Sequence, residues 1–199
     1  MSAGALHFRR RSLPVFALLL ACAPCVSRAS SVPPLAGIMA DLAAMPDRRA
    51  DFTEEKRLSS LTTPLVSRGQ LLYRRPSYLE KITLSPKPER LIVSGETLII
   101  QSGSAPARQI DLSEHPIVQA MVDTIRGTIA GDLATLERYY TITQQGDRSA
   151  WQLTMIPTDP RMAKRIKVIE VAGRGIDVQR IRTTQANGDE DLLTIRTIE

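Results

Sequence analysis

One helical stretch set among strands decides the fold: residues 113–131, with the sequence SEHPIVQAMVDTIRGTIAG. Ser113 is expected to cap the start of this helix, and Gly131 to follow its end. Because an amphipathic helix must bury its apolar stripe against another element, we expect it to cover one face of a sheet. The stripe recurs at three- and four-residue spacing and consists of Ile117, Val118, Met121, Val122, Ile125 and Ile129.

The sequence on both sides of this helix alternates with a period of two, which predicts antiparallel strands. Turn sequences such as Ser94-Gly95-Glu96 and Gly173-Arg174-Gly175 separate them. The first strand is expected from Arg48, and the others lie near residues 69–73, 79–84, 91–93, 97–101, 109–112, 139–143, 151–156, 166–171, 176–183 and 191–198.

Two further short helices complete the expected fold. One lies between Pro34 and Pro46, with apolar residues at helical spacing, and Asp132 is expected to cap the other. The fold class is therefore α+β, mainly β: an antiparallel sheet of about ten or eleven strands with three short helices. A sheet of this size must curl, and the helices then cover one of its faces.

The N-terminus has the three parts of a secretory signal peptide. Residues 7–11 are basic, residues 13–26 are apolar, and Ser27-Arg28-Ala29 is a small-x-small cleavage sequence. We therefore expect residues 1–29 to be removed, which leaves residues 30–199 as a single exported domain with one sizeable core.

Two other interpretations of this segment are open. An uncleaved membrane anchor needs about 18 apolar residues, and this run is shorter and contains Pro14 and Pro24. A lipid anchor at Cys22 is the second alternative, because Leu19-Leu20-Ala21 precedes that cysteine.

The net charge of +5 belongs mostly to the signal segment. Removal of Arg9, Arg10, Arg11 and Arg28 leaves 22 basic residues against 21 acidic ones. A nearly neutral domain with few aromatic residues argues against a nucleic-acid partner. Both cysteines also lie in the removed segment, so the domain forms no disulfide and no thiolate metal site.

The domain carries no recognisable catalytic or cofactor motif. Its one histidine, His115, stands beside a proline at a helix start, and no nucleophile elbow, zinc-binding helix or phosphate-binding loop is present. Asp189-Glu190-Asp191 lacks the alternating spacing of a calcium loop and is expected at a solvated hairpin. We therefore expect a binding protein, not an enzyme, with no cofactor or metal.

The apolar residues suggest what is bound. A curved sheet covered by helices encloses a concave apolar space. Ordinary core packing is the simpler interpretation of each residue taken singly, but methionines on the helix faces suit a cavity that repacks around different guests. The residues expected to line an acyl-chain cavity are Met39, Leu42, Leu71, Tyr73, Met121, Ile125, Trp151, Leu153 and Met155.

Five short motifs, taken in order, resemble the LolA-type periplasmic carriers of outer-membrane lipoproteins. The most specific is GQLLYRRP at residues 69–76. The others are DFTE at 51–54, YLEK at 78–81, LIVSGETL at 91–98 and VAGRG at 171–175.

The resemblance implies an incomplete β-barrel closed by a helical lid. In that family the arginine of the Arg-Pro pair points into the cavity and hydrogen-bonds the lid, so Arg75 is expected to act as a latch. Lys81 stands where the family usually has an aromatic residue, which indicates a less aromatic cavity and leaves the guest open.

The predicted function is a periplasmic carrier, acting as a monomer, that binds the acyl chains of a lipoprotein or another envelope lipid and transfers it toward the outer membrane. The partners implied are the acylated cargo, an inner-membrane releasing complex and an outer-membrane acceptor. The alternative is an envelope lipid sensor that uses the same half-barrel to regulate a protein partner.

Overall fold

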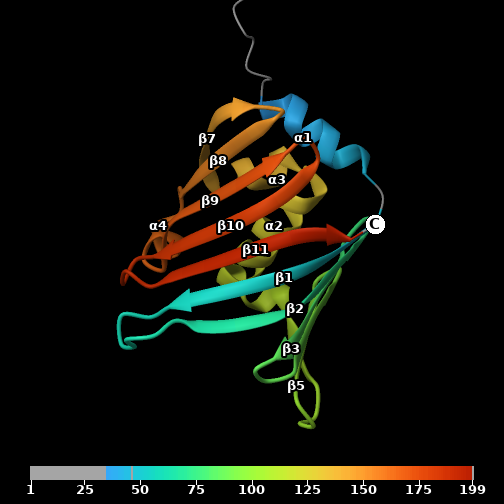
Figure 1. Ribbon diagram of the computed structural model, residues 1–199, viewed down its shortest axis with the longest axis vertical. Helices are drawn as coiled ribbons and strands as arrows, with labels where there is room; N and C mark the ends of the chain where they lie inside the picture. Colours follow the sequence, from blue (N-terminus) through green and yellow to red (C-terminus); the bar gives the residue numbers. More distant parts are fainter. Residues whose placement is uncertain (1–34, 46, 199) are drawn as a thin grey trace, which may run out of the picture. The chain divides into compact units, whose positions relative to one another are not determined.

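Eleven antiparallel strands form one sheet in the computed structural model, which describes residues 35–45 and 47–198 (Figure 1). All the expected strands are present, so the prediction of ten or eleven is confirmed. The described residues fall in one compact unit, Val32–Glu199, and the expected signal peptide and Cys22 lie outside them. The strands are β1 Arg48–Arg57, β2 Leu65–Arg74, β3 Tyr78–Ser85, β4 Glu89–Ser94, β5 Thr97–Ser102, β6 Arg108–Asp111, β7 Tyr140–Asp147, β8 Ala150–Pro157, β9 Ile166–Arg174, β10 Asp177–Gln185 and β11 Glu190–Ile198.

The first and last strands of the chain pair in the middle of the sheet, where β1 lies between β2 and β11. Successive hairpins extend the sheet from this centre to β6 on one side and to β7 on the other. Among the described strands these two edges do not pair, so the sheet is not closed. The helical segment joins β6 to β7, and its path from edge to edge takes it across the sheet's inner face (Figure 1).

Four helices are present in the described residues, α1 Leu35–Ala44, α2 Pro116–Ala130, α3 Leu133–Glu137 and α4 Pro160–Ala163. The three expected helices are thus confirmed, and Asp132 caps α3 by accepting a hydrogen bond from the amide of Thr135. The fourth, α4, was not expected. It is a single turn that begins with a proline, and Asp159 caps it through the amide of Arg161.

The ends of α2 are fixed by local chemistry. The expected start at Ser113 is wrong, because Asp111 caps a separate 3-10 turn there and α2 begins at Pro116. Gly131 ends the helix in the left-handed region, with φ of 68°. A side chain at Gly131 would lie 2.1 Å from the carbonyl oxygen of Met39, so this glycine also lets α1 and α2 pack closely.

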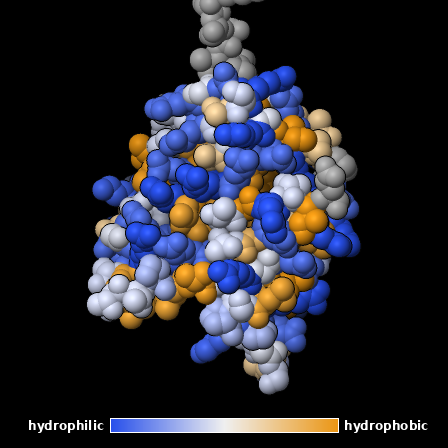
Figure 2. Space-filling model, in the orientation of Figure 1, coloured by the Kyte–Doolittle hydropathy of each residue, from blue (hydrophilic) through white to orange (hydrophobic). Residues whose placement is uncertain are grey.

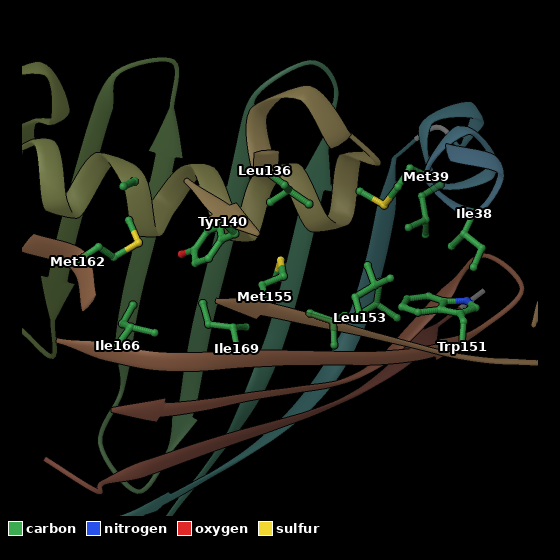
Figure 3. Close-up of a cluster of buried hydrophobic side chains, with 14 residues drawn as sticks. Ile38, Met39, Leu136, Tyr140, Trp151, Leu153, Met155, Met162, Ile166 and Ile169 are labelled. Carbon is green, nitrogen blue, oxygen red and sulfur yellow. The ribbon is translucent and has the colours of Figure 1, made fainter. Parts of the chain in front are cut away.

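One large apolar cluster fills the space between the helices and strands β7 to β10 (Figure 3). Trp151, Leu153 and Met155 project from β8 toward the helices, as their alternation predicts. Met39 and Leu136 face them from α1 and α3. A second cluster joins α2 to strands β2 to β5 and comprises Tyr73, Leu79, Val93, Leu98, Leu112, Val122 and Ile129.

The outer face of the sheet is mostly hydrophilic, with separated hydrophobic residues (Figure 2). Gln152, Glu170, Arg180 and Arg182 lie together on this face over β8, β9 and β10. Of the two faces of the described sheet, the inner one is the apolar face, so a large apolar binding site is expected beneath the helices.

Candidate binding cavity

The second cluster does not fill the space beneath α2, which contains a cavity of about 300 Å³. This volume lies at the lower end of the range for small-molecule sites. Helix α2 contributes Val118, Met121, Val122, Ile125 and Ile129, and the sheet contributes Glu54, Leu71, Leu79, Lys81, Leu91, Val93, Leu98, Ile181, Thr183, Asp191, Leu193 and Ile195. Most of this lining is aliphatic, so the cavity suits an apolar chain.

Two smaller spaces adjoin the cavity and share its walls. One of about 40 Å³ lies beside Leu71, Leu79 and Ile129, and one of about 80 Å³ lies beside Met121 and Ile125. Met121 and Ile125 are 44% and 42% exposed although they line these spaces, as expected where solvent can enter. Together the three spaces form a trough along the inner side of α2.

The nine residues expected to line the cavity divide into two groups. Leu71, Met121 and Ile125 line the main cavity, and Tyr73 lines the 40 Å³ space. The structure places the other five in the packed cluster, nearly inaccessible to solvent: Met39, Leu42, Trp151, Leu153 and Met155. Those five are core because α1 and α3 cover the β7 to β10 half of the sheet and fill it.

Three charged residues lie in the cavity wall: Glu54, Lys81 and Asp191. Lys81 stands at the position that the family resemblance related to the cavity, whereas Glu54 and Asp191 were not expected there. The Lys81 ammonium donates to Glu54 Oε1 at 2.6 Å, and the Ser67 hydroxyl donates to Glu54 Oε2 at 3.0 Å. Lys56 joins the carboxylates, with Nζ 3.7 Å from Glu54 Oε1 and 3.3 Å from Asp191 Oδ2. We call Glu54, Lys56, Lys81 and Asp191 the charged cluster.

The electrostatics of the two carboxyl groups differ. Burial opposes ionisation of Glu54, but Lys81, Lys56 and Ser67 outweigh it and hold the pKa of this carboxyl below its ordinary value. Burial raises the pKa of Asp191, and the nearby Glu54 charge adds to the effect. The neighbours of Glu54 therefore favour its ionised form, whereas the surroundings of Asp191 oppose ionisation.

Period-two alternation could have found these residues. Glu54 shares the inner face of β1 with Ala50 and Phe52, and Asp191 shares that of β11 with Leu193 and Ile195. The expectation of a solvated hairpin is therefore wrong for Asp191, which is half-buried in the cavity wall.

Arg75 lies in the turn between β2 and β3 and contacts the end of α1. Its Nε donates to the carbonyl of Met45 at 2.6 Å, and a second guanidinium nitrogen donates to the carbonyl of Ala43. These are carbonyls that a helix C-terminus leaves unpaired, so the arginine caps α1. Its side chain is exposed and is not among those lining the three spaces.

The described residues contain no group of acidic, histidine or cysteine side chains placed to hold a metal ion. In the same residues, no helix is both long and apolar enough to span a bilayer. His115 immediately precedes α2 and is not among the residues that line the cavity.

Comparison with known proteins identifies one family. The family described as outer membrane lipoprotein carrier protein LolA-like matches residues 27–196, from before α1 into β11. No curated protein matches the chain by sequence.

Three solved structures are similar at low identity. A LolA superfamily protein from Nitrosomonas europaea is 11% identical, with a TM-score of 0.44 over 79% of this chain and 88% of that one. A chain in the complex of Pseudomonas aeruginosa MucA/MucB is 14% identical, with a TM-score of 0.47 over 82% of this chain and 56% of that one. A DUF1329 family protein from Desulfovibrio piger is 8% identical, with a TM-score of 0.43 over 81% of this chain and 88% of that one.

Proposed function

Because the chain belongs to the outer membrane lipoprotein carrier protein LolA-like family, we propose that it carries acylated molecules across the periplasm. In this proposal the cavity holds the acyl chains of a lipoprotein or another envelope lipid, and the protein performs no chemistry of its own. An inner-membrane complex supplies the cargo and an outer-membrane acceptor receives it.

The observation that carries the proposal is the aliphatic cavity of about 300 Å³ beneath α2. Burying an acyl chain there removes methylene groups from water, which stabilises the complex by about 0.8 kcal/mol for each one. Enclosing roughly eight methylenes gives about 6 kcal/mol before the cost of association is subtracted. Binding of this strength is reversible, as a handover requires.

The contact between Arg75 and α1 supplies a latch in this proposal. α1 packs against the C-terminal end of α2 at Gly131, so α2 cannot lift from the sheet at that end while α1 is held. Release of the two carbonyls by Arg75 frees α1, and the cavity can then widen around cargo. Reforming the same hydrogen bonds favours the closed, empty state.

The proposal is tested by binding of a fluorescent fatty-acid probe to the mature protein and to two matched variants. Ile125→Glu places a charge in the cavity wall, whereas Ile156→Glu places one on an outward position of β8 with similar exposure. We expect the first variant to lose probe binding and the second to retain it.

Native mass spectrometry of protein purified from the periplasm provides the second measurement. A co-purifying acylated molecule supports the carrier. Equal probe binding by both variants, together with recovery of apo protein alone, would rule the cavity out as the binding site.

A further inference from the structure

The charged cluster lies at one end of an otherwise aliphatic cavity. Inner-facing residues alternate along β1 from Arg48 through Phe52 to Glu54 and Lys56. Arg48 lines the 40 Å³ space and Glu54 the main cavity, and their strand positions are separated by about 20 Å. The wall is therefore charged at one end, aliphatic along its middle, and bordered by a single arginine at the other end.

The members of the cluster differ in unused hydrogen-bonding capacity. Both carboxylate oxygens of Glu54 have donors, and Asp191 has Lys56. Lys81 has three N–H donors, and in the described part of the chain its ammonium has one hydrogen-bond acceptor, Glu54 Oε1. Its Nζ also lies over the Phe52 ring, 5.0 Å from the ring centroid. The unused capacity at this end therefore belongs to a cationic donor.

An acyl chain that fills the cavity displaces the water around Lys81. A purely apolar guest would leave its remaining N–H groups without acceptors, which is unfavourable for a buried charge. A guest that ends in an anionic oxygen would replace that water with charge-assisted hydrogen bonds.

We infer that Lys81 binds the anionic head group, a carboxylate or phosphate, of an amphiphile whose acyl chain runs from the charged cluster along α2. The inference rests on the proposed function, because it requires the cavity to hold an acyl chain. It adds to that function the class of cargo and the direction in which the cargo lies.

The carboxylates of the cluster do not favour a cationic guest instead. Glu54 is engaged by Lys81 and Ser67, so a guest cation would have to displace existing donors. Asp191 lies 3.3 Å from the Lys56 ammonium, so a guest cation there would also have to compete with an existing partner.

The test compares ligands of one chain length that differ only in the head group. Palmitic acid, methyl palmitate, hexadecylamine and hexadecyl phosphate compete with a fluorescent probe at neutral pH. We expect the acid and the phosphate to bind about 10- to 100-fold more tightly than the methyl ester, the range that a charged hydrogen bond gives. Inorganic phosphate alone should not compete, because it lacks the chain.

Four variants assign the effect to Lys81. Lys81→Met should bring the acid-to-ester affinity ratio close to one, and Lys81→Arg should preserve it. Glu54→Gln with Lys81→Met removes both charges of the pair, which avoids an unpaired buried carboxylate, and should give the same lost preference. Arg48→Met is the matched control at the other end of the cavity and should leave the ratio unchanged.

The outcomes separate the two proposals. Binding of all ligands without acid preference, a preference for the amine, or a ratio that survives Lys81→Met would overturn the assignment while leaving an acyl-binding cavity. A ratio lost in Arg48→Met but not in Lys81→Met would place the head group at the opposite end and also overturn it. Failure of every ligand to bind would contradict the carrier function itself.

Discussion

Replacing Arg75 with leucine should loosen α1. The guanidinium donates to the carbonyls of Ala43 and Met45, and leucine leaves both without this donor. Charged hydrogen bonds contribute about 1.5–3 kcal/mol each, and because this side chain is exposed we expect a smaller total, about 1–2 kcal/mol. The population with α1 detached should therefore rise by a factor of roughly 5 to 30.

Hydrogen exchange of the α1 amides, Leu35–Ala44, measures this population directly. Arg74→Leu is the matched control: Arg74 is also exposed and lies 3.9 Å from Asp47, but it has no contact with the α1 carbonyls. We expect faster exchange in Arg75→Leu only, with slower release of bound fatty-acid probe because the closed state is weakened. Equal α1 exchange rates in the two variants would refute the latch.

Three further predictions test the charged cluster, the packing of the helices and the division between core and cavity. The pKa of Glu54 is lowered, so its stabilising effect is present above the ordinary value of 4.5 and disappears as the pH falls through the folded-state value. The difference in free energy of unfolding between the native protein and Glu54→Gln should therefore shrink with acidification, and a constant difference in denaturant titrations would contradict this. Gly131→Ala should lower the free energy of unfolding by more than Gly188→Ala. Both glycines have positive φ, but only at Gly131 would the new methyl meet a backbone atom, and equal melting temperatures would disprove the close α1 contact. Leu153→Ala should cost about 2–5 kcal/mol of stability with little change in probe binding, whereas Leu71→Ala should mainly weaken binding; the reverse pattern in paired melting and binding measurements would contradict the placement of these leucines.

Local patterns in the sequence were sufficient for most of the fold. Alternation located all eleven strands, apolar spacing located α1 and α2, and the cap at Asp132 located α3. The helix start was missed by two residues, with His115 at the capping position in place of Ser113, because two capping signals compete there and Asp111 caps a 3-10 turn just before Pro116. α4 was missed because one helical turn carries no periodicity, although Asp159 followed by a proline was a usable signal.

The candidate site was less predictable, since it depends on where helices dock. Trp151 and Leu71 both alternate onto the inner face. The sequences of their strands do not reveal that α1 covers Trp151 and leaves Leu71 beside a cavity. Glu54 and Asp191 were missed for a different reason. Composition assigns charged side chains to solvent, whereas period-two alternation would have placed Glu54 and Asp191 on the inner face, where the structure has them.

The inner face of the sheet is divided into a packed half and a half with a cavity, and this division explains how the protein can leave the cavity unfilled. At about 24 cal/mol per Å³, an empty cavity of about 300 Å³ costs up to ~7 kcal/mol, an upper bound because water can enter the trough. This is comparable with the net stability of a whole domain, about 5–15 kcal/mol. Most of the side chains with the lowest exposure, including Leu153, Met155 and Val171, lie in the half under α1 and α3, which supplies compensating stability. Because an acyl chain would recover part of the cavity cost, the loaded protein should be the more stable form, and the melting temperature should rise when ligand is added.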